Sequence, residues 1–108
     1  MAKKNSTPRP DPRELALPRT GVETHAHLDM EHFDKDRAEV LQRAREAGVA
    51  WFGQVFLGPA AYLRGREFFA GHEDVFFLLG IHPHDAASCD EKSLEAMRQA
   101  FVENPGGR

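Results

Sequence analysis

Two histidines separated by one residue are the feature of this sequence most suited to chemistry. They occur in His25-Ala26-His27, directly after a short predicted strand at residues 21–24. Side chains two residues apart in a strand point to the same face, so both imidazoles can reach one ion while Ala26 points away. Neutral imidazole binds zinc and other first-row metal ions well. We therefore predict that His25 and His27 lie side by side and bind one metal ion. The alternative is a pair of ordinary surface or core histidines.

A carboxylate follows the histidine pair after one more residue. Asp29 is two positions beyond His27. Its side chain could accept a hydrogen bond from the second nitrogen of a metal-bound imidazole, as carboxylates near metal sites often do. It could equally cap a turn. The sequence leaves both interpretations open.

A second histidine-rich segment follows an apolar run in the segment Gly80-Ile81-His82-Pro83-His84-Asp85. Gly80 lets the backbone turn and Pro83 stiffens the predicted loop. We predict that His82 orients the scissile group, contacts a phosphate or supports a metal ligand. His84 and Asp85 are further candidates for substrate binding or for support of the metal site. The alternative is a loop whose histidines make ordinary hydrogen bonds.

The intervening sequence alternates buried runs with helical patterns. We predict strands at 21–24, 49–57 and 75–80, and helices at 35–47, 60–70 and 90–103. Asp34 is the predicted N-cap of the first helix, and Gly48 is its predicted stop. Apolar residues expected to face inward on the second and third helices are Leu63, Phe68, Phe69, Leu94, Met97 and Phe101.

This alternation predicts an α/β fold. Strands that are apolar on both faces and are joined by helices indicate a parallel sheet covered on both sides. Right-handed crossovers place all the carboxyl ends of the strands at one edge, so His25, His27 and His82 should meet there. Three parallel strands leave two edges unpaired, which indicates the first part of a larger structure.

Composition and charge narrow the class of protein. The 108 residues allow one small domain, preceded by a flexible leader at 1–20 that holds four of the seven prolines. Residues 1–20 carry a net charge of +3 and residues 21–108 carry −6, which argues against a general nucleic-acid coat. One cysteine excludes an internal disulfide. No apolar run approaches the roughly 20 residues of a membrane span, and no secretory signal is present, so we expect a cytoplasmic protein.

Together these motifs resemble the TatD family of metal-dependent hydrolases. The resemblance covers residues 21 to about 103 and rests on Glu23-Thr24-His25-Ala26-His27-Leu28-Asp29, Phe33-Asp34, Ala47-Gly48-Val49 and Gly80-Ile81-His82-Pro83-His84-Asp85-Ala86. It implies the first three βα units of a TIM-type (β/α)8 barrel, with one or two divalent ions whose identity as zinc, magnesium or manganese stays open. It also implies a deoxyribonuclease or phosphodiesterase that uses metal-activated water on DNA.

The resemblance covers only part of the family pattern. That pattern has a Glu after the next strand that bridges two metal ions, followed by two further His and a final Asp. The 108 residues end where that strand would begin, so we expect residues 21–108 to correspond to the N-terminal part of a barrel whose C-terminal segment is missing. We expect this chain alone to be inactive toward DNA. The alternatives are an inactive fragment that pairs with another chain, and a metal-dependent hydrolase that acts on a non-nucleic substrate.

Overall fold

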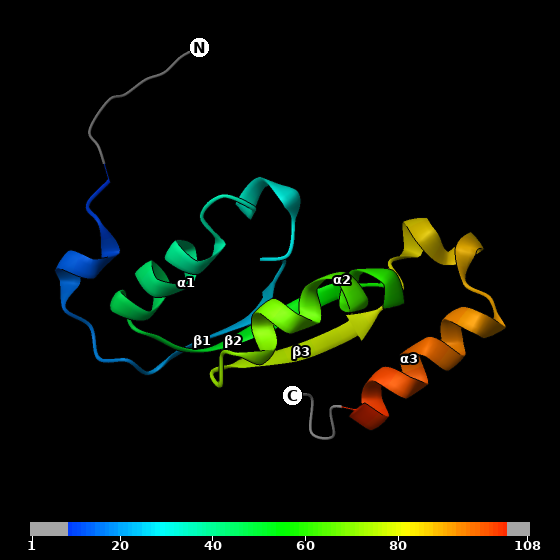
Figure 1. Cartoon of the computed structure of the whole chain (residues 1–108). Coiled ribbons are helices and arrows are strands. Elements are labelled where there is room, and N and C mark those ends of the chain that lie inside the picture. The colour runs from blue at the N-terminus through cyan, green and yellow to red at the C-terminus, as the bar shows by residue number, and fades with distance from the viewer. Residues whose placement is uncertain (1–8, 104–108) are drawn as a thin grey trace, which may run out of the picture.

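A computed structural model describes residues 9–103 of the chain (Figure 1). Its strands are β1 (Gly21–Ala26), β2 (Val49–Leu57) and β3 (Val75–Gly80). Its α-helices are α1 (Arg37–Glu46), α2 (Pro59–Ala70) and α3 (Glu91–Glu103). Three short 3-10 helices complete it: η1 (Pro12–Leu15), η2 (Glu31–Phe33) and η3 (Pro83–Ser88). Among these residues, no helix is both long enough and apolar enough to span a membrane.

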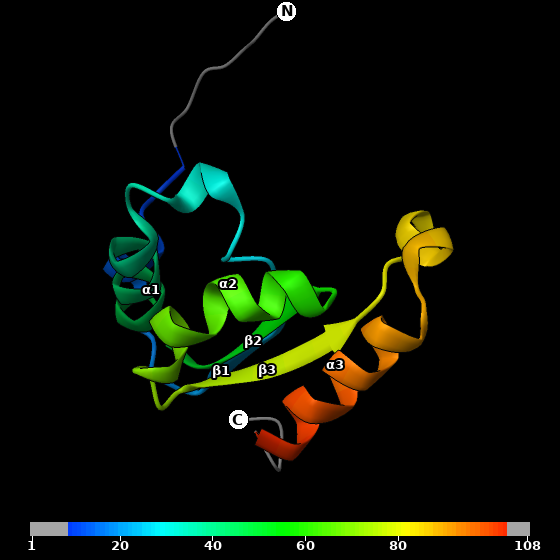
Figure 2. The same ribbon diagram turned by 45° about the vertical axis from the view of Figure 1, so that its right-hand side comes forward.

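The three strands form one parallel sheet in the order β1-β2-β3. This confirms the predicted α/β fold and places the carboxyl ends of all three strands at one edge (Figure 2). The pairing of β2 with β3 is regular from Phe52↔Val75 to Leu57↔Gly80. The pairing of β1 with β2 is interrupted between Glu23 and Ala26, and its last pair is Ala26↔Gln54. The second histidine of the pair therefore lies beyond the last paired position of β1.

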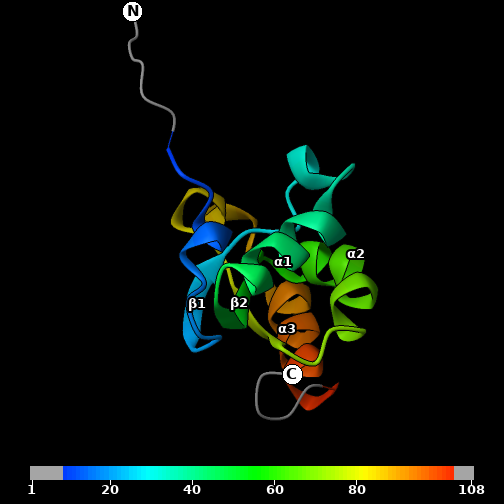
Figure 3. The ribbon, with the colours of Figure 1, turned by 90° about the vertical axis from the view of Figure 1, so that its left-hand side faces the viewer.

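All three α-helices lie on one side of the sheet (Figure 3), so the predicted coverage of both faces is wrong for the described residues. The strand order is sequential, and each right-handed crossover then places its helix on the same face. A helix on the other face would need a strand that is added on the opposite side of its predecessor, so that the order of the strands reverses. This one-sided arrangement is that of consecutive units in a β/α barrel, where the helices form an outer ring.

Aromatic side chains fill the layer between the sheet and the helices. Phe56 is fully buried, and its ring meets Tyr62, Phe69 and Phe77 edge to face at centroid distances of 5.2–6.0 Å. Edge-to-face contacts of this kind stabilise beyond the area they bury. The core also contains Leu41, Phe52, Ala61, Val75 and Ala100. Helix α3 joins it through α2, since Glu103 accepts hydrogen bonds from Tyr62 and Arg66.

Several apolar residues predicted to face inward are exposed. Leu63, Leu94 and Phe101 are each more than half exposed, and Ala100 is the residue that α3 buries. The prediction is confirmed for Phe69, which is in the core, and for Phe68, which packs against it. On α3 the periodicity found the helix but not the side that packs. A close approach of α3 to the core favours a small side chain at the contact, whereas the apolar stripe alone predicted larger ones.

Helix α1 begins two residues later than predicted. The segment before it forms η2, and Asp34 follows η2 instead of capping α1. The Asp34 carboxylate forms an ion pair with Arg37 Nη2 at 2.7 Å instead of capping the helix. Asp36 precedes the helix without a side-chain cap.

A network of charged side chains lies at the amino-terminal edge of the sheet, at the end opposite the histidine pair. The Asp74 carboxylate accepts hydrogen bonds from Arg45 Nε at 2.7 Å and from Arg19 Nη2 at 2.7 Å. Arg45 holds the pKa of Asp74 below its usual range, chiefly through these hydrogen bonds. Arg45 Nη2 also lies 3.0 Å from His72 Nδ1, and burial followed by this neighbouring charge lowers the pKa of His72.

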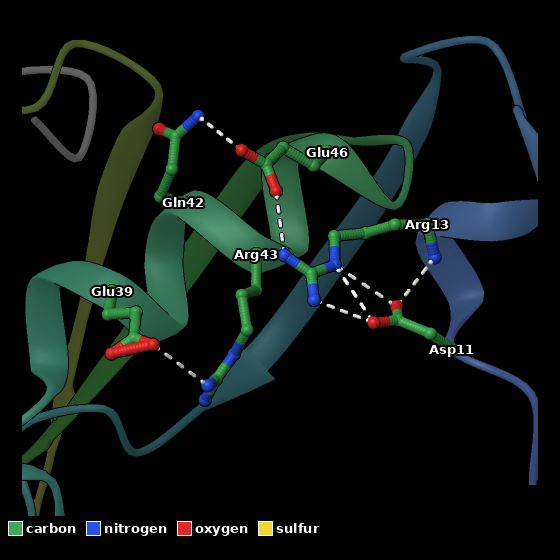
Figure 4. Close-up of polar contacts among 6 residues, drawn as sticks. All are labelled: Asp11, Arg13, Glu39, Gln42, Arg43 and Glu46. Atoms are coloured by element: carbon green, nitrogen blue, oxygen red, sulfur yellow. Dashed lines mark hydrogen bonds and ion pairs between the residues drawn. The ribbon is translucent and has the colours of Figure 1, made fainter.

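Part of the segment predicted as a flexible leader contacts α1 (Figure 4). Arg13 in η1 pairs with Asp11 and reaches Glu46 Oε1 at 3.0 Å. Both partners are exposed, so each pair stabilises the chain only slightly. Residues 1–8 of the predicted leader lie outside the described residues.

Candidate functional site

The histidine pair lies at the carboxyl end of β1, where the strand leaves the sheet. The rings of His25 and His27 are 5.1 Å apart between centroids and almost perpendicular, at 76°. The predicted proximity is thus present. His25 is exposed and His27 is half-buried. The backbone N–H of His25 donates to Glu23 Oε1 at 2.9 Å, which folds that carboxylate back along the strand.

A backbone carbonyl orients His27. Its Nδ1 lies 3.3 Å from the carbonyl oxygen of Val55 in β2. A carbonyl can only accept, so this contact requires the proton on Nδ1 and leaves the lone pair on Nε2. Histidine ligands of metal ions are typically oriented in this way, through a hydrogen bond from the nitrogen that does not bind the metal.

Asp29 does not make the contact with an imidazole that one interpretation predicted, as far as the described hydrogen bonds show. Its Oδ1 accepts instead from Gln54 Nε2 at 2.9 Å. Arg37 fixes the same loop from α1, because its guanidinium donates to the carbonyl oxygens of Leu28, Asp29 and Met30. The loop after the histidine pair is therefore held from both β2 and α1.

Gln54 is the residue of this region that the sequence patterns did not reveal. It lies in the apolar run of β2 and is completely buried. Its Oε1 accepts from the N–H of Leu28 at 2.8 Å, and its Nε2 donates to Asp29 and to the carbonyl of Val55. A lone glutamine inside an otherwise apolar strand was the available signal, since a buried amide needs hydrogen-bond partners.

The second histidine-rich segment forms η3 instead of an irregular loop. His82 is its N-cap, and His82 Nδ1 accepts from the N–H of His84 at 3.1 Å. The neutral ring then carries its proton on Nε2, which makes that nitrogen a donor. The rings of His82 and His84 are 4.5 Å apart, and the backbone N–H of Asp85 donates to the His82 carbonyl at 2.8 Å. These residues follow β3 at the same edge of the sheet as the histidine pair.

A cleft of about 680 Å³ lies between α2 and the loop after β1. Asp29, Arg37, Arg64 and Gly65 contribute to its walls, but neither His25 nor His27 does. The cleft is therefore separate from the histidine pair, although Asp29 borders it.

The donor set fits a divalent ion in part. Two imidazoles are adjacent, and His27 has Nε2 available for a metal ion once Nδ1 donates to Val55. Within residues 9–103, no group of three or more His, Cys, Asp or Glu side chains is arranged to hold an ion. Catalytic zinc sites usually have three protein ligands. The described residues thus bring two possible ligands together and do not form a complete metal site.

Comparison with known proteins shows the family of this chain. The sequence model of the family described as TatD related DNase matches residues 22–106. The chain belongs to the TatD family. The match begins within β1 and includes the histidine pair as well as the segment of η3.

Curated relatives match this chain over only part of their own length. An uncharacterized metal-dependent hydrolase of Bacillus subtilis, YabD, is 30% identical over 71% of the chain and 30% of its own length. An uncharacterized metal-dependent hydrolase of Escherichia coli, YjjV, is 31% identical over 78% of the chain and 32% of its own length. The 3'-5' ssDNA/RNA exonuclease TatD of Cronobacter sakazakii is 31% identical over 67% of the chain and 27% of its own length. The chain thus spans about a third of the length of these relatives.

The crystal structure of the Escherichia coli TatD homologue YjjV has the same arrangement of elements. It aligns with a TM-score of 0.70 at 28% identity, covering 81% of this chain and 34% of that protein. The parallel β/α arrangement is therefore that of the TatD fold, with the barrel incomplete in this chain.

Proposed function

We propose that this chain forms the metal-binding N-terminal part of a TatD-type nuclease that acts on DNA. The observation that carries the proposal is the His25-Ala26-His27 pair at the end of β1, with Nδ1 of His27 donating to the Val55 carbonyl. The named activity of the Cronobacter relative, a ssDNA/RNA exonuclease, supports a nucleic-acid substrate. Two of the relatives are named metal-dependent hydrolases, which supports the need for a metal ion.

His25 and His27 would hold the divalent ion in this proposal, His27 through Nε2. When bound, the ion supplies Lewis-acid stabilisation of the phosphoryl group and lowers the pKa of a water molecule. The tautomer that His84 imposes on His82 leaves an Nε2–H that can donate to a phosphate oxygen. His84 and Asp85 are proposed substrate-binding residues beside it, and Asp29 supports the loop after the histidine pair.

Metal binding by the chain itself is the first test. Zinc or manganese titrated into the purified chain should perturb the NMR signals of His25 and His27, and the double variant His25→Ala, His27→Ala should abolish this binding. The variant His32→Ala is the matched control, because His32 is exposed and adjoins Phe33 instead of the pair. Equal affinity in the double variant would contradict the assignment.

Nuclease assays then test the substrate. The chain alone should not cleave DNA at an enzyme-like rate with manganese, magnesium or zinc, because two imidazoles fall short of the three ligands usual in catalytic zinc sites.

Residues 22–103 grafted in place of the matching segment of the Cronobacter exonuclease should give metal-dependent cleavage of single-stranded DNA. The same graft with His25→Ala and His27→Ala should be inactive. A graft that binds metal but leaves DNA intact would refute the nucleic-acid substrate and favour a non-nucleic one.

A further inference from the structure

Gln54 has a place in the structure that packing alone does not explain. It is the only buried polar or charged residue among those described, and its side chain is 0% exposed. Its neighbours two positions away, Phe52 and Phe56, belong to the apolar core. Burial of an amide in such surroundings is unfavourable unless the amide is hydrogen-bonded. An apolar side chain would fill this position at lower cost if only the core had to be built.

Two of the three hydrogen bonds of the Gln54 side chain lead to the turn that follows the histidine pair, and the third goes to a carbonyl of its own strand. Oε1 accepts from the N–H of Leu28, the residue directly after His27, at 2.8 Å. Nε2 donates to Asp29 Oδ1 at 2.9 Å and to the Val55 carbonyl at 3.0 Å. That carbonyl is also the acceptor facing His27 Nδ1 at 3.3 Å. One carbonyl oxygen thus joins the Gln54 amide to the imidazole.

These contacts begin where the backbone ladder stops. Ala26↔Gln54 is the last paired position between β1 and β2. Beyond it, the amide oxygen of Gln54 accepts from the Leu28 N–H, as a strand carbonyl would in a continued ladder. The backbone on either side of His27 is therefore fixed, by strand pairing before it and by the Gln54 side chain after it.

We propose that Gln54 is a positioning residue for His27. It fixes the backbone after His27 and the shared Val55 carbonyl, so that Nδ1 of the imidazole donates and Nε2 stays free for a metal ion. The proposal rests on the proposed function of the histidine pair as a metal site. It extends that function to a residue that contacts neither the metal ion nor the substrate.

The test compares the intact chain with two variants of Gln54. Gln54→Met has a side chain of similar length without the amide, and so removes all three hydrogen bonds. Gln54→Glu keeps an acceptor for the Leu28 N–H but places a carboxylate oxygen against Asp29 and the Val55 carbonyl. Val75→Ala is the matched control, because Val75 is 4% exposed in the core at the opposite end of the sheet. It lowers stability without touching the turn.

Two readouts follow the imidazole and the metal separately. The 15N shifts of the His27 ring in the metal-free chain report which nitrogen carries the proton. We expect the Nδ1–H form in the wild type and in Val75→Ala, and a shift toward Nε2–H in Gln54→Met. Zinc affinity should fall roughly ten- to a hundredfold in Gln54→Met, the usual effect of removing a group that orients a metal ligand. Gln54→Glu should also bind zinc more weakly than the wild type. If Gln54→Met does not fold, Gln54→Glu alone tests the positioning role.

The outcomes separate this inference from the proposed function. An unchanged His27 tautomer and unchanged zinc affinity in both Gln54 variants would overturn the positioning role while the metal site stands. Equal losses in Val75→Ala would also overturn it, because they would show a general effect of stability. A wild-type chain that binds zinc no better than the His25→Ala, His27→Ala variant would refute the metal site. The ring tautomer of His27 would still test Gln54 in that case.

Discussion

Asp74 shows how much one residue can connect at the edge of the sheet opposite the histidines. Its side chain is 15% exposed and pairs with arginines from two distant segments, Arg19 before β1 and Arg45 in α1. The pair of Glu39 with Arg43 on α1 has the same chemistry, but the Glu39 side chain is 65% exposed. Water screens such exposed pairs, so the two should contribute differently to stability.

We predict that Asp74→Asn lowers the free energy of unfolding by about 2 kcal/mol at pH 7, since hydrogen bonds to charged groups contribute roughly 1.5–3 kcal/mol. The exposed control Glu39→Gln should change it by less than about 0.5 kcal/mol. The pKa of Asp74 is lowered in the folded chain. Its contribution is therefore fully present above the ordinary carboxyl pKa and is lost as the pH falls through the folded value.

Urea unfolding of both variants at neutral and acidic pH measures this effect. The difference between Asp74→Asn and the wild type should narrow as the pH falls below about 4, where the carboxyl group of the unfolded chain becomes protonated. A difference that stays constant down to acidic pH would show that charge plays no part.

Among the elements, α2 depends on a residue without a side chain. Gly65 lies in the middle of this helix, where glycine normally disfavours helix formation. A Cβ atom at Gly65 would lie 2.8 Å from the Phe56 ring and 3.7 Å from Cβ of Asp29. The absence of a side chain lets α2 pack closely on β2 and on the loop after the histidine pair.

Gly65→Ala should destabilise the chain by about 1–3 kcal/mol, because overpacking against the rigid Phe56 ring outweighs the gain in helix propensity. Gly71→Ala at the end of the same helix is the matched control. Its nearest neighbour to an added Cβ is the Phe68 carbonyl oxygen at 3.9 Å, so that variant should be neutral or slightly more stable. Thermal unfolding followed by circular dichroism compares the two, and equal melting temperatures would contradict the close packing of α2.

On the scale of the whole molecule, the sheet has one covered and one open face. The helices pack on one side (Figure 3), and Trp51 in β2 is 45% exposed. Val22 in β1 is 55% exposed, and on α3 Phe101 and Val102 are each more than half exposed.

Trp51 is the only tryptophan of the chain and reports directly on this face. Acrylamide should quench its fluorescence readily in the folded chain, because nearly half of the side chain is accessible. Increasing the protein concentration should protect Trp51 if copies associate through the open face. Protection from acrylamide in a chain shown to be monomeric by sedimentation would contradict the open face.

Local patterns in the amino-acid sequence determined much of this protein by themselves. Two apolar runs predicted β2 and β3, because a strand in a covered sheet has few polar residues whatever its partners are. The spacing of His25 and His27 determined that their rings lie together, because side chains two positions apart share a face of a strand. The helical periodicity found α1, α2 and α3 within about two residues.

The tertiary structure decided what depends on partners distant in sequence. The contact of His27 with Val55 spans 28 residues, and that of Gln54 with Leu28 spans 26. Such contacts depend on the register of β1 against β2, which no local pattern specifies. The same is true of the side on which α3 packs and of the one face that all the helices cover. Residue types and spacing in the sequence thus located the histidine pair, whereas only the folded sheet could bring the Gln54 side chain into contact with the turn after that pair.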